Sequence, residues 1–151
     1  MIVRSIQGRL AYPVPVELDP ATDYPLGTRR PDLVRTPSGI ALDRVTLPAA
    51  RAGELASADV RATPETLALQ AQVARKAGRP QLADGLERAS ELASVPDDEL
   101  LEIYTALRPG RSTSDELEVW AARLEELGAR RTASFVREAA AVYVERGLVA
   151  E

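Results

Sequence analysis

Two short stretches of this sequence carry charged side chains at a spacing that could do chemistry. In the first, Asp97, Asp98 and Glu99 are consecutive, and carboxylates are the hard oxygen ligands that divalent cations prefer. The same acids follow Pro96 at the start of an expected helix, where negative charge stabilises the exposed N–H groups without a metal. We expect the acids to stabilise the start of the helix, and therefore no metal site.

The second stretch reads Arg108-Pro109-Gly110-Arg111-Ser112-Thr113. Two arginines ahead of a helix N-terminus could hold an anion. Alternatively, the stretch is a turn in which Ser112 caps the next helix, with Asp115 three residues on, and the arginines pair with carboxylates of this chain or of a partner. The sequence leaves both interpretations open.

The residue types that most enzymes use are missing. The chain has 0 Cys and 0 His, which excludes disulfides, thiolate nucleophiles, histidine-based triads and zinc sites built on imidazole or thiolate. The glycine-rich motifs of nucleotide-binding loops are also absent. We therefore expect no catalytic and no cofactor-binding residue in this chain, and any chemistry to be carried elsewhere.

Charge and hydropathy indicate which partners and which cellular location to expect. With 19 Lys+Arg against 23 Asp+Glu, the net charge of −4 is not typical of a nucleic-acid-binding protein. No apolar run is long enough to span a membrane, and Met1–Leu10 is too short and too polar for a signal peptide. We expect a cytoplasmic protein that binds neither nucleic acid nor membrane.

The elements that position these residues fall into two regions. Seven of the 11 prolines lie between Pro13 and Pro48. Proline removes a backbone donor and biases the preceding residue toward extended geometry. Residues 1–45 are therefore predicted to be an extended, mostly irregular arm, with at most a short strand at Ile2–Leu10. The arm keeps many apolar side chains, so we expect it to lie across its own domain or a partner.

Residues 46–151 are predicted to form a mainly α domain, a compact bundle of about five to six short helices. Capping residues and glycines delimit the helices at 47–52, 63–77, 80–94, 96 to the Pro109-Gly110 break, 112–127 and 131–146, with a single turn capped by Ser57. Apolar spacing places Leu82, Tyr104, Trp120 and Phe135 among the side chains facing the core.

Several strings, in this order and spacing, resemble the small (gamma) subunit of the adenosylcobalamin-dependent diol and glycerol dehydratases. The densest is VPDDELLEIYTALRPGRST, from Val95 to Thr113. Asp23-Tyr24-Pro25-Leu26 and Thr63-Pro64-Glu65-Thr66-Leu67 precede it, and Phe135-Val136-Arg137-Glu138-Ala139-Ala140 follows it. The resemblance covers roughly residues 23–148.

The resemblance implies a holoenzyme that is a dimer of heterotrimers. In this family the large subunit is a TIM barrel that holds the substrate, cobalamin lies between the large and medium subunits, and the small subunit packs on the outside. The holoenzyme converts a vicinal diol, such as propane-1,2-diol or glycerol, to an aldehyde and water by a radical mechanism. Some members are housed in bacterial microcompartments, where an N-terminal amphipathic helix can direct encapsulation; the 12 residues before Pro13 lack its apolar stripe.

Our hypothesis is a non-catalytic subunit that braces the large subunit and binds no cofactor alone. Its expected contact points are Tyr24, Pro25 and Leu26 in the arm, and Arg108, Arg111 and Ser112 in the turn. An arm already stiffened by proline loses less entropy on docking. The alternative is a free-standing helical adaptor with no connection to cobalamin. An independent small enzyme is disfavoured, because nothing outlines a carboxylate–metal site.

Overall fold

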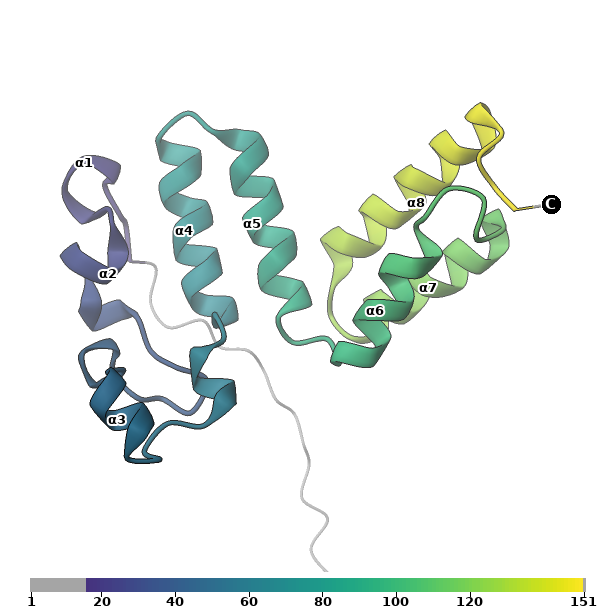
Figure 1. Ribbon diagram of the computed structural model, residues 1–151. Helices are drawn as coiled ribbons and strands as arrows, with labels where there is room; N and C mark the ends of the chain where they lie inside the picture. Colours follow the sequence, from purple (N-terminus) through teal and green to yellow (C-terminus); the bar gives the residue numbers. More distant parts are fainter. Residues whose placement is uncertain (1–15, 151) are drawn as a thin grey trace, which may run out of the picture.

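The computed structural model describes residues 16–150, and these are mainly α-helical, as predicted. The expected strand at residues 2–10 lies outside the described residues. Figure 1 shows the helices in two groups along the chain, with an N-terminal group built on the α4–α5 hairpin and a C-terminal group of α6, α7 and α8. The helices are α1 (Pro20–Asp23), α2 (Leu26–Arg29), α3 (Leu47–Arg51), α4 (Pro64–Lys76), α5 (Pro80–Leu92), α6 (Asp97–Ala106), α7 (Ser114–Glu126) and α8 (Arg130–Arg146), with 3-10 turns η1 (Pro31–Leu33), η2 (Leu42–Arg44) and η3 (Ser57–Val60).

The described part of the arm is more ordered than its proline content predicts. Between Val16 and residue 45 it forms α1, α2, η1 and η2 rather than continuous extended chain. The reason lies in where the prolines stand, since Pro20 and Pro31 occupy the first turns of α1 and η1. The first helical position needs no N–H partner, so proline favours a helix start there. The domain boundary at residue 45 stays a prediction.

The arm is fastened to α4 by a small core and one polar side chain. Leu18 and Leu26 are buried against Val73 of α4. Gln72 accepts a hydrogen bond from the Leu18 backbone N–H at 2.9 Å and donates one to the Val16 carbonyl at 3.0 Å. This single side chain therefore satisfies two backbone groups that no helix or sheet would otherwise pair.

A second polar cluster holds the loop between η1 and α3. Asp59 in η3 is buried, accepts a hydrogen bond from the Ser38 hydroxyl, and accepts another from the Ala56 N–H at 2.9 Å. These bonds hold the pKa of the Asp59 carboxyl below its ordinary 3.8, and the bond from Ser38 has the largest effect. Ser57 does not cap this turn as predicted, because Ala56 occupies the cap position and Asp59 reaches back to it instead.

The C-terminal group has the larger core. Ten buried residues pack between α6, α7 and α8 and the segments that join them, and Trp120 and Tyr143 pack against them. Leu117, Leu124 and Val136 are almost completely buried there. The Tyr143 hydroxyl donates a hydrogen bond of 2.6 Å to the Leu107 carbonyl, which ties the end of α8 to the end of α6.

The two groups meet where α5 touches α8. Helix α8 has no side-chain cap of its own, because its cap residue is Ala129. Glu91 at the end of α5 supplies one, accepting hydrogen bonds from the N–H groups of Arg131 at 3.0 Å and Thr132 at 2.9 Å. A carboxylate at this position also opposes the positive end of the helix dipole. The acid that caps α8 is therefore 40 residues away in the sequence.

Three side chains predicted to face the core are exposed instead. Leu82 is exposed because α5 turns Ala83 and Ser90 inward, and the small Ala71 and Ala74 of α4 lie in the same cluster as Ala83. Tyr104 lies beside, rather than on, the buried face that Ile103 and Ala106 define on α6. Phe135 packs with the guanidinium of Arg88 4.8 Å above its ring. Trp120 lies partly in the core, as predicted.

Candidate partner-binding surfaces

The arm residues predicted to touch a partner separate into surface and core. Tyr24 follows α1 and is 57% exposed, and Pro25, joined to it by a cis peptide bond, is exposed at the start of α2. Leu26, in contrast, is only 3% exposed because it packs with Leu18 and Val73. Tyr24 and Pro25 can therefore reach another molecule, whereas Leu26 holds the arm on its own chain.

The predicted turn residues separate in the same way. Arg108 and Arg111 are exposed between α6 and α7, and within residues 16–150 neither pairs with a carboxylate. Ser112 is buried, and its carbonyl accepts a hydrogen bond of 2.9 Å from the N–H of Ala150 near the C-terminus.

Ser112 is not the cap of α7, which corrects the predicted capping by one residue. Thr113 is the cap, and its hydroxyl accepts a hydrogen bond from the Glu116 N–H at 3.2 Å. The Glu116 carboxylate accepts one from the Thr113 N–H at 2.9 Å, which completes a capping box. Ser112 and Thr113 both offer a hydroxyl, and it is Thr113 that pairs reciprocally with Glu116 at the third helical position.

The consecutive acids lie in the first turn of α6, and two of them bind arginines. Glu99 accepts hydrogen bonds from Nε and Nη2 of Arg123 on α7, at 2.7 and 2.9 Å, and this bidentate bond lowers the pKa of Glu99. Asp97 pairs with Arg61, which precedes α4, and its pKa is likewise lowered. Within residues 16–150 no cluster of three or more His, Cys, Asp or Glu side chains is arranged to hold a metal ion.

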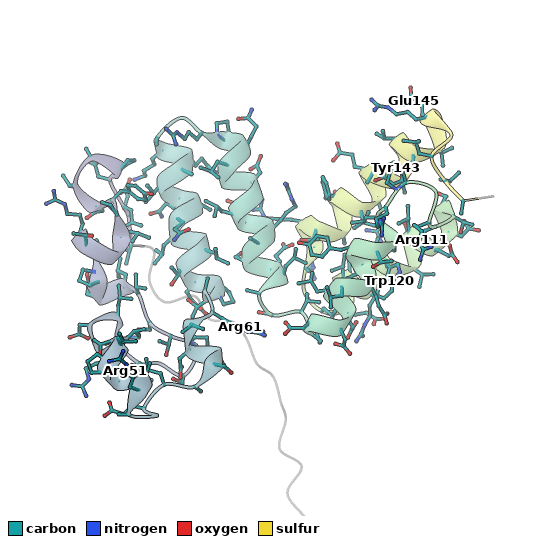
Figure 2. The ribbon with its side chains drawn as sticks, viewed as in Figure 1. Arg51, Arg61, Arg111, Trp120, Tyr143 and Glu145 are labelled. Atoms are coloured by element: carbon teal, nitrogen blue, oxygen red, sulfur yellow. The ribbon has the colours of Figure 1, made fainter. Side chains whose placement is uncertain are left out.

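A groove that sequence reasoning missed lies on α6 and α7. We call it the Trp120 groove; it has a volume of about 390 Å³, and its walls include Leu101, Glu102, Thr105, Arg111 and Trp120. Figure 2 labels Trp120 on α7 and Arg111 in the turn that precedes it. Leu101 is 68% exposed. The sequence could have indicated this exposure, because Leu101 is out of phase with the apolar stripe of Leu100, Ile103 and Leu107.

Another hollow lies between α4 and the loop after η1. It has a volume of about 690 Å³, and Asp32, Arg35, Glu65 and Gln72 bring charge and polarity to an otherwise apolar wall. The Gln72 amide is already engaged with the backbone of the arm. Thr36 and Thr63 also line this hollow. No helix within residues 16–150 is long and apolar enough to cross a membrane.

These features describe a mainly α protein in which some of the described arginines pair with acids of the same chain, while Tyr24, Arg108 and Arg111 are exposed. The family model of the dehydratase small subunit matches residues 20–150. A propanediol dehydratase small subunit from Citrobacter freundii is 49% identical over 149 residues, covering 95% of this chain and 87% of that protein. One from Salmonella typhimurium is 51% identical over 126 residues, covering 83% of this chain and 73% of that protein.

The match over nearly the whole described chain shows the family. This chain belongs to the dehydratase small subunit family. It is therefore one subunit of a hydro-lyase, and larger subunits complete the enzyme.

Proposed function

We propose that this chain is the non-catalytic small subunit of an adenosylcobalamin-dependent diol dehydratase that converts propane-1,2-diol or glycerol to an aldehyde and water. The observation that carries the proposal is the identity of about one half, over most of the chain, to two proteins named propanediol dehydratase small subunit. The residue composition supports the non-catalytic role, because 0 Cys and 0 His leave the usual nucleophiles and bases out.

The residues of this chain do not fit adenosylcobalamin. The hollow beside α4 is about 690 Å³, within the range of pockets for drug-sized ligands, whereas a corrin ring with its nucleotide and adenosyl groups is much larger. The proposal therefore assigns the cofactor and the substrate to a large TIM-barrel subunit and a medium subunit, in a dimer of heterotrimers.

The mechanical role proposed for this chain is to brace the large subunit. Two kinds of surface support this role: the exposed Tyr24-Pro25 pair of the arm, and the exposed arginines of the α6–α7 turn. Both project from elements that the chain's own contacts hold in place, which reduces the entropy lost on docking. Location in the cytoplasm, or inside a microcompartment through a partner's targeting segment, belongs to the same proposal.

Reconstitution tests the proposed function. Large and medium subunits are assayed for aldehyde formation from propane-1,2-diol and from glycerol with adenosylcobalamin, with and without this chain. We expect stable activity only when the chain is present. Full and lasting activity without it would refute the bracing role, and no activity under any combination would refute the assignment to this reaction. A free-standing adaptor would leave the assay unchanged.

A further inference from the structure

The Trp120 groove combines side-chain types that dominate protein interfaces. Trp, Tyr and Arg are the residues that most often carry binding energy at the centre of an interface. The only Trp of the chain lies in this groove with Arg111, and exposed Tyr104 is on the same helix as the groove residue Leu101. Leu101 exposes 68% of its surface although α6 has an apolar core face close by.

The groove also carries a charge that the residues described by the structure leave unpaired. Arg123 on α7 and Arg137 on α8 each bind two carboxylates of this chain. Within residues 16–150, Arg111 pairs with none. A guanidinium beside an indole and an aliphatic side chain is weakly hydrated and presents a planar set of donors, so it suits a carboxylate from another molecule.

We propose that the Trp120 groove receives one apolar side chain of a larger dehydratase subunit, flanked by an Asp or Glu that pairs with Arg111. This inference rests on the proposed function. The volume of about 390 Å³ suits a single large side chain rather than a whole helix. Glu102 also lines the groove and repels a carboxylate, so the incoming acid pairs with Arg111 and the apolar side chain lies against Trp120 and Leu101.

Variants in the whole assembly test this docking. The chain is co-expressed with its large and medium subunits, and the amount retained is measured against salt and dilution. Leu101→Glu and Arg111→Glu are expected to weaken retention at least tenfold, and Arg111→Lys less, because Lys keeps the charge but loses the paired donors. Val119→Glu is the matched control: Val119 is equally exposed, at 68%, but does not line the groove, and retention is expected to be unchanged.

The outcomes separate this inference from the proposed function. Wild-type retention with undiminished retention of Leu101→Glu and Arg111→Glu would overturn the docking site and leave the proposed function standing. Failure of the wild type to be retained at all would overturn both. If the free chain self-associates through the groove, and Leu101→Glu makes it monomeric without affecting the assembly, a second copy is the occupant and the proposal is wrong.

A second readout does not depend on variants. Because the chain has one Trp, 5-fluorotryptophan places a single fluorine label in its described structure at Trp120. We expect one ¹⁹F resonance for the free chain, which shifts and loses its solvent isotope effect when unlabelled large and medium subunits are added. An unchanged resonance in a complex that sizing shows to be intact would overturn the proposal.

Discussion

The two groups of helices are held together in different ways. In the C-terminal group, ten buried residues form one core between α6, α7 and α8. In the N-terminal group, the arm is held on α4 by a cluster of three buried apolar residues and by the bonds of Gln72, and Asp59 of η3 holds Ser38 of the arm. Burial of apolar area stabilises in proportion to its extent, whereas a hydrogen bond adds little net energy but fixes geometry. The C-terminal group is thus built for stability and the arm for position.

The largest expected effect comes from breaking the C-terminal core. Leu124→Ala removes a side chain with 0% exposure and should lower the free energy of unfolding by about 2–5 kcal/mol. Leu18→Ala removes an equally buried side chain from the smaller cluster, and should release the arm while leaving α6–α8 protected. Chemical denaturation and hydrogen exchange of both variants measure this. Equal, global losses would contradict the distinction between the groups.

The next effect comes from the polar fastening of the arm. Gln72→Ala leaves the Leu18 N–H and the Val16 carbonyl without their partner, at a cost of about 1–3 kcal/mol. The loss should be local, so that exchange accelerates at the Leu18 amide and not at amides of α7. Gln81→Ala, an exposed glutamine on α5, is the control and should change neither. Uniform acceleration in both groups would show that the arm is not a separate unit.

Two glycine substitutions in the N-terminal group should have smaller effects on stability, of opposite sign. A Cβ added at Gly85, inside α5, would meet no atom within 4 Å, so Gly85→Ala should stabilise this group by about 0.5–1 kcal/mol through helix propensity. Gly78→Ala, in the turn before α5, should destabilise it instead, because Gly78 has φ +73°. Thermal denaturation reports both signs, and a loss in Gly85→Ala would contradict the open surface seen here.

The smallest expected effect on stability comes from the ionisation of Asp59, and its pH dependence shows only in acid. The pKa of Asp59 in the folded protein is lower than the ordinary 3.8, chiefly through the Ser38 hydroxyl, so the ionised group stabilises the fold above pH 3.8. That contribution is lost as the pH falls through the lowered pKa. The stability difference between the wild type and Asp59→Asn should therefore be constant near neutrality and shrink in acid. A difference independent of pH down to about 2 would contradict this account.

The sequence predicts the long helices well because their signals are local. Thr63 with Pro64, Gly78 and Gly147 mark ends that the structure confirms in α4 and α8. What could not be predicted depends on partners far along the chain. Glu91 caps α8 across 40 residues, and the inward rotation of Ala83 on α5 follows from close packing on α4. The arm's short helices begin where proline occupies the first turn, and the number of prolines does not reveal their positions within turns.

The surface residues show the same limit. Periodicity cannot tell a side chain at the edge of a core face from one inside it, which is why Tyr104 and Phe135 are exposed. Conversely, the resemblance points to Tyr24, Pro25 and Leu26 together, but the packing of Leu18 and Val73 takes only Leu26 inward. Whether the exposed residues touch a partner stays a prediction.

We propose that this chain works as one subunit of a larger dehydratase. Native mass spectrometry of the complex purified through this chain, expressed from its own operon, tests it most directly. We expect the chain to be found with the large and medium subunits in equal copy numbers, in a species that forms aldehyde from propane-1,2-diol. Recovery of the chain alone, with the aldehyde-forming activity in a fraction that lacks it, would contradict the account.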